Sequence, residues 1–145
     1  MRVLALLLAG LAAPVAAQEV RPCDWIARAD AIVEPWEAHS RTFANGAVRL
    51  ALLDVIEPAA GAFHLLILSP PYDEVGGRQC RTLGLGQGMG FAQADFTSLT
   101  AGYDPAVGLI FGMEVGVMGT GGNVVPRSLG FTLNQATGAI ATALQ

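Results

Sequence analysis

Residues 108–133 read GLIFGMEVGVMGTGGNVVPRSLGFTL, and this stretch decides the fold class. Its apolar residues alternate with small or polar ones on both sides of a glycine-rich break at residues 119–123. A period of two is typical of a β-strand with one buried face. The stretch therefore predicts two strands, 108–118 and 124–133, whose apolar faces carry Leu109, Phe111, Met113, Val115 and Val117, and Leu129, Phe131 and Leu133.

Two loops beside this stretch share one plan, in which an Asp or Asn is followed four residues later by Gly. They read DPAVG at 104–108 and NQATG at 134–138. The first side chain caps a type I turn, and the glycine takes the left-handed backbone position. This plan indicates β-hairpins, so we expect two further strands, at residues 94–103 and 139–144.

Four more strands are expected closer to the N-terminus, at residues 41–44, 47–56, 62–69 and 79–85. Asn45-Gly46 predicts a type I′ turn between the first two. Pro70-Pro71 is expected to end the third, because proline cannot donate a hydrogen bond to a ladder. These signals predict a mainly β fold, an antiparallel meander of about eight strands that is barrel-like or a sandwich.

One short N-terminal helix is expected over residues 23–33. Asp24 is a good N-cap, and apolar side chains follow at nearly helical spacing. Pro35 would end this helix, because the residue before a proline avoids the helical conformation.

The first 17 residues have the plan of a cleavable signal peptide. Arg2 precedes an apolar run that is too short to span a bilayer, and small residues precede an expected cut after Ala17. The alternatives are a buried N-terminal helix or a retained anchor. We expect residues 18–145 to form a single β-rich domain without a membrane span, located in the periplasm or secreted, and monomeric or weakly oligomeric.

Composition narrows the classes of partner and the redox compartment. Residues 18–145 contain seven arginines, twelve acidic residues and no lysine, a formal net charge of −5, which argues against nucleic acid. An even count of two cysteines in an exported chain predicts a disulfide between Cys23 and Cys80. Two free thiols or a redox pair are the alternatives. No cofactor motif is present.

Two segments are candidate binding sites. The long connection SPPYDEVGGR at 69–78 combines rigid prolines with Tyr72, Asp73, Glu74 and Arg78. Trp36 lies between two charged residues and could anchor a partner. The alternatives are a solvated connection held near the disulfide and a tryptophan that caps one end of a barrel.

Alternating glycines at 84, 86, 88 and 90 lack the G-x-G-x-x-G spacing of a dinucleotide site. We expect the N-terminal helix or Trp36 to pack on them, with a ligand groove or a flexible loop as alternatives. Gly112 and Gly116 form a second sparse stripe. The two histidines, His39 and His64, have no neighbouring ligands of their own type, so no metal site is predicted.

A resemblance supports the expected location. Residues 43–49, FANGAVR, resemble a family of small exported bacterial proteins with no known activity, as do LD at 53–54, EPAAG at 57–61 and LSPPYD at 68–73. The resemblance covers most of the chain after the signal peptide and implies export, but no site.

The sequence predicts a soluble binding or interaction module, with an inhibitor-like role among the options, whose partner is an envelope protein or a small ligand. The alternatives are a structural or assembly accessory of the cell envelope and a small hydrolase. No catalytic set of side chains can be selected from the sequence.

Overall fold

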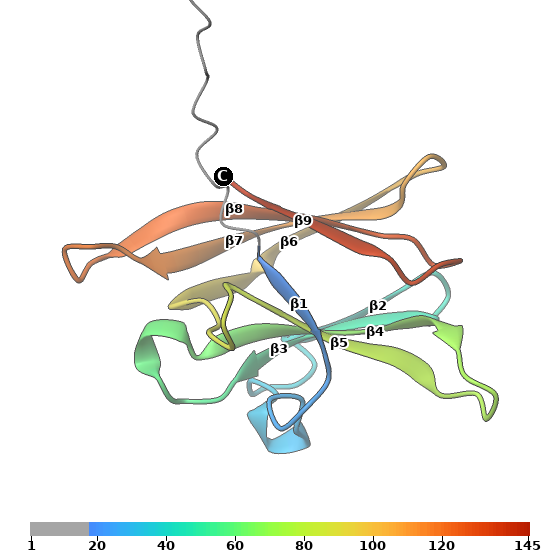
Figure 1. Cartoon of the computed structure of the whole chain (residues 1–145), viewed down its shortest axis with the longest axis horizontal. Helices are drawn as coiled ribbons and strands as arrows, with labels where there is room; N and C mark the ends of the chain where they lie inside the picture. The colour runs from blue at the N-terminus through green and yellow to red at the C-terminus, as the bar shows by residue number, and fades with distance from the viewer. Residues whose placement is uncertain (1–17) are drawn as a thin grey trace, which may run out of the picture.

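The computed structural model describes residues 18–145 and shows two antiparallel sheets stacked face to face (Figure 1). The first has the order β1-β5-β4-β3-β2, with β1 Glu19–Pro22, β2 Ser40–Phe43, β3 Val48–Asp54, β4 Phe63–Tyr72 and β5 Arg78–Gly84. The second has the order β6-β7-β8-β9, with β6 Gln93–Asp104, β7 Gly108–Met118, β8 Val124–Leu133 and β9 Ile140–Leu144.

The mainly β, antiparallel prediction is confirmed, and the arrangement is sandwich-like rather than a closed barrel. Among the described residues no helix is long and apolar enough to cross a membrane. The predicted signal peptide, residues 1–17, lies outside the described residues.

The core lies between the two sheets and is built from alternate residues of both. Phe111 of β7 stacks on Phe131 of β8 with ring centroids 4.8 Å apart. The ring of Phe43, from the first sheet, meets Phe111 edge-on at 5.0 Å. Each large apolar side chain buried here contributes about 1.5–3 kcal/mol to stability, so this layer holds the two sheets together.

All eight predicted strands are present, and the hairpin plans are confirmed. Gly108 and Gly138 have φ angles of 101° and 75°, and the side chains of Asp104 and Asn134 each accept a backbone N–H two residues on. Asn45 and Gly46 have positive φ angles, as the type I′ turn requires.

The ninth strand, β1, was not predicted from the sequence. Its four residues are too few to show a period, but they add an edge to the sheet by pairing with β5, with Val20 opposite Leu83. The side chain of Val20 then packs against the core.

The predicted helix at residues 23–33 is wrong. Asp24 Oδ1 accepts the N–H of Ile26 at 3.0 Å, which makes a tight turn, and only Ala29–Ala31 form one turn of 3₁₀ helix. Further on, the N–H of Val33 donates to Leu52 O of β3 at 3.0 Å rather than within a helix. Pairing with the sheet and burial of Ile26 outweigh the local helical pattern.

The prediction that Pro70-Pro71 ends the third strand is also wrong. β4 continues to Tyr72, and its pairing with β5 shifts register between Ser69 and Tyr72. The two prolines therefore lie in a bulge beyond the β3 pairing, where their missing N–H groups break no ladder.

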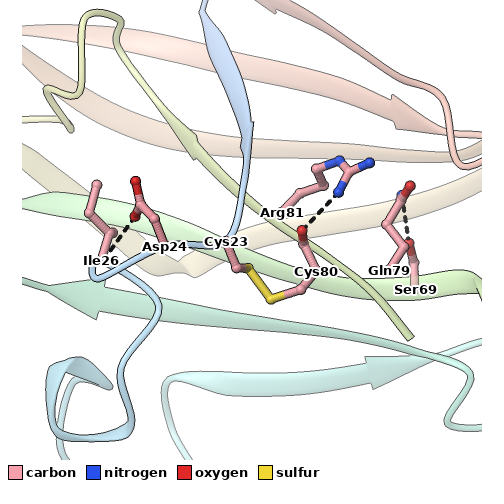
Figure 2. Close-up of a disulfide and its surroundings, with 7 residues drawn as sticks. All are labelled: Cys23, Asp24, Ile26, Ser69, Gln79, Cys80 and Arg81. Atoms are coloured by element: carbon pink, nitrogen blue, oxygen red, sulfur yellow. Dashed lines mark hydrogen bonds between the residues drawn. A yellow bond between two sulfur atoms is a disulfide. The ribbon is translucent and has the colours of Figure 1, made fainter. Parts of the chain in front are cut away.

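The Cys23–Cys80 disulfide is confirmed and is shown in Figure 2. The backbone N–H of Cys23 also donates to Cys80 O at 3.2 Å, so the bond continues the β1–β5 ladder. Cys80 lies opposite Leu68 of β4, on the face of the first sheet that is turned away from the core. The linked residues are 57 positions apart and enclose β2, β3 and β4.

The alternating glycines accommodate His64 and the turn that follows β5. A Cβ on Gly84 would meet His64 Nδ1 at 2.9 Å, and one on Gly90 would meet His64 Nε2 at 2.8 Å and the backbone of Phe63. The expectation that a helix or Trp36 packs on these glycines is therefore wrong, since the predicted helix over residues 23–33 does not form and the buried imidazole of His64 lies against Gly84 and Gly90.

Candidate functional site: a pocket beside Trp36

The outer face of the first sheet, turned away from the core, carries a second, smaller group of buried residues at one end. There Ile26 and Ala31, from the segment between β1 and β2, bury Leu53 of β3 and Val55, which follows β3, in a small second core. Figure 1 shows this segment on the outer side of the five-stranded sheet. The rest of the outer face lies beyond these residues and is not covered by them.

A loop at that boundary holds Trp36 in place. Ile32 pairs with Leu53 of β3, and β2 then pairs with the same edge of β3. Residues 34–38, between these two pairings, leave the edge and form a loop. The residues on both sides of this loop are hydrogen-bonded to the same residue of β3, Leu52. Its carbonyl oxygen accepts the N–H of Val33, and its N–H donates to His39 O at 2.9 Å. We call residues 33–39 the Trp36 loop.

Bonds inside the loop close it further. Ala38 N donates to Pro35 O at 3.0 Å, and His39 N donates to Trp36 O at 3.2 Å. His39 Nδ1 lies 3.1 Å from the same Pro35 oxygen. A loop closed at both ends and crossed by three contacts restrains the backbone at Trp36, a residue that remains 48 % exposed.

A pocket of about 300 Å³ lies between this loop and the sheet, and we call it the Trp36 pocket. Its floor is Ala51 of β3 with Leu66 and Leu68 of β4. The remaining lining residues are Ile32, Trp36 and Glu37 from the loop side, and Ser40 and Arg49 from β2 and β3. An aromatic wall over an aliphatic floor makes a concave apolar site with a few polar groups, the usual form of a small-molecule site.

Two opposite charges lie at this pocket. Arg49 Nη1 donates to Ser40 Oγ at 3.0 Å, which uses one of the five N–H donors of the guanidinium. Glu37 and Arg49 are both exposed, and the ion pairs found among the described residues involve neither of them. Both charges therefore remain available to a ligand.

The other predicted site residues lie at the β4–β5 hairpin and do not line the Trp36 pocket. Asp73 Oδ1 accepts the N–H groups of Val75 and Gly77, at 3.1 and 2.6 Å, so its carboxylate shapes the turn. Arg78 Nη2 donates to Gly46 O at 2.9 Å and links this hairpin to the β2–β3 turn. Tyr72 and Glu74 are exposed.

Sequence reasoning identified Trp36 but missed its neighbours in the pocket. The signal for them was weak but present: β3 and β4 carry apolar residues on both faces, because Leu66 and Leu68 alternate with the core residues Leu65 and Ile67. A strand that is apolar on both faces needs a cover on each, or leaves one face partly open.

Two hollows lie on the outer face of the second sheet, of about 340 and 290 Å³. Gly130 and Ala143 line both. The polar groups there satisfy one another, since Ser128 Oγ donates to Glu114 Oε1 at 2.6 Å and Glu114 N donates to Ser98 Oγ at 2.8 Å. No aromatic side chain lines the larger hollow, and the phenylalanines at the smaller one, Phe111 and Phe131, are buried in the core. The Trp36 pocket instead combines an exposed aromatic side chain with two charged ones, so it is the candidate site.

His64 lies in a niche of about 10 Å³, which has room for about one water molecule. Desolvation lowers the pKa of this imidazole; Asp24 and Glu19 oppose that shift, while Arg21 adds to it. A substrate does not fit this space. Among residues 18–145 no group of three or more His, Cys, Asp or Glu side chains is arranged to hold a metal ion.

Comparisons with protein-family models, curated proteins and solved structures found no match. The candidate site therefore stands on its geometry alone.

Proposed function

We propose that this protein is an exported binding module that holds the apolar part of a small molecule in the Trp36 pocket. The observation that carries the proposal is an exposed indole held by a closed loop over an aliphatic floor. A pre-formed site of this kind avoids much of the ordering cost of binding. The disulfide supports a location outside the cytoplasm, in the periplasm or the medium, because such bonds persist in oxidising compartments.

The test uses a neutral apolar dye, N-phenyl-1-naphthylamine, whose emission rises when its rings leave water. The unmodified protein should give a saturable increase with one site. Trp36→Ala should abolish the increase, while Trp25→Ala should retain it, because Trp25 is also exposed but does not line the pocket. Ala51→Leu adds volume at the floor and should also abolish binding; because Ala51 is buried, the variant's circular dichroism should first match that of the unmodified protein. Equal binding by all four proteins would overturn the proposal.

One observation favours a second candidate, a structural or assembly accessory of the cell envelope. Within residues 18–145, β6 pairs with β7 alone, and its last five residues, 100–104, are all exposed. An open strand edge can accept a strand from another protein. A photo-crosslinking amino acid at position 102 should capture an envelope protein in the producing cell if this role is correct, and should capture none if it is not.

A further inference from the structure

We propose that the Trp36 pocket binds a free α-amino acid with a large apolar side chain. This inference rests on the proposed function and adds the chemistry of the ligand. Three features of the pocket carry it: its volume, its apolar surfaces and the two opposite charges in its lining.

The volume selects a small ligand. About 300 Å³ is the lower end of the range for pockets that take drug-sized molecules. An apolar side chain placed between Trp36 and the floor of Leu66 and Leu68 would lose part of its contact with water. Each CH₂ group buried there favours binding by about 0.8 kcal/mol.

The charges select a zwitterion. Arg49 has donors to spare for a carboxylate, and such charge-assisted bonds can be bidentate. Glu37 lines the same pocket from the loop side and would repel a ligand that carried only a negative charge. An ammonium group beside Glu37 and a carboxylate beside Arg49 use both side chains, and a free amino acid carries these two groups on one carbon.

The test is a calorimetric titration with L-leucine and three relatives. N-acetyl-L-leucine lacks the ammonium group, L-leucine amide lacks the carboxylate, and glycyl-L-leucine separates the two charges. Leucine should bind about tenfold more tightly than the acetyl and amide relatives, which is the effect expected for one charge-assisted contact, and also more tightly than glycyl-leucine, whose charges are too far apart. Leucine binding no tighter than its acetyl or amide relative would overturn the inference, and tighter binding of glycyl-leucine would replace the amino acid by a peptide.

Charge variants assign each contact through the ratio of two affinities, for leucine and for one of its relatives, measured on the same variant. A change in the stability of the variant does not alter this ratio. Arg49→Gln should bind leucine and leucine amide equally, and Glu37→Gln should bind leucine and N-acetyl-leucine equally. Matched controls are Arg127→Gln on the second sheet and Glu34→Gln beside the pocket, which should keep the preferences of the unmodified protein. Preferences retained in the Arg49 and Glu37 variants would overturn the inference. Binding of the neutral dye without binding of any amino acid would overturn it while leaving the proposed function intact.

Discussion

Replacing Cys23 and Cys80 together by alanine should lower the free energy of unfolding by about 4 kcal/mol. The two residues are 57 positions apart, and the chain-entropy model gives this figure for closing a loop of that length at 25 °C. For a domain of this size the loss lowers the unfolding midpoint by about 15 °C. The native fold should persist, because the core between the sheets contains neither cysteine.

The assay is urea denaturation of the double variant and of the unmodified protein, with and without reductant. Without the bond the unfolded chain is more expanded and exposes more surface, so the slope of stability against urea should also increase. Reduced unmodified protein should match the double variant, which checks that the substitutions themselves cost little.

A loss below about 1 kcal/mol with an unchanged slope would refute the reasoning, since it would mean that the bond does not restrict the unfolded chain. A large loss with native circular dichroism and an increased slope would support it.

Three other perturbations follow from the packing. Burial lowers the pKa of His64, so the unfolded chain takes up a proton more readily than the folded one. The free energy of unfolding should therefore fall as the pH drops below 6.5, by at most about 1.4 kcal/mol per pH unit, and level off below the folded pKa. In urea titrations, His64→Gln should flatten this pH profile. Gly90→Ala should lower the free energy of unfolding by more than 2 kcal/mol, because its Cβ would clash with the backbone of Phe63. The Cβ of Gly102→Ala would meet nothing within 4 Å, so this variant should be neutral or more stable by about 0.5 kcal/mol. Equal chemical denaturation midpoints for the two variants would contradict this. Phe111→Ala should cost about 3–5 kcal/mol in the same assay, because the ring lies between two other aromatic rings; a cost below 1 kcal/mol would show that the sheets do not depend on this contact.

Strand positions and hairpin turns were predictable because their signals are local. The alternation of Phe111 and Met113 with small or polar neighbours requires only a period of two, and the loop of Asp104 and Gly108 requires only one capping side chain and one left-handed residue. The same local logic failed at residues 23–33. There, the side chain of Ile26 packs against Leu53 and the N–H of Val33 donates to Leu52 O. Both partners lie on β3, far away in the sequence.

The candidate site was only partly predictable for a related reason. An exposed Trp36 between two charges could be singled out by inspection, and the structure places it at the wall of a pocket. Its floor comes from β3 and β4, whose residues acquire their roles only once the register brings Ala51 beside Leu66. The segment 69–78 was the first candidate in the sequence, but its hydrogen bonds to the turn backbone and to Gly46 show a part in shaping and linking two hairpins.

The sequence by itself determined where eight of the nine strands lie, how most of them turn, and that Cys23 and Cys80 would pair, because each rests on a short-range pattern or on a count of two. Only the tertiary structure decided that the strands divide into two stacked sheets, that the outer face of the first is half covered, and that the Trp36 loop encloses a pocket on the open half. These outcomes depend on which apolar faces bury one another across long sequence separations. The hydrophobic effect is non-directional and depends on buried area, so a local sequence pattern does not specify which faces pack together.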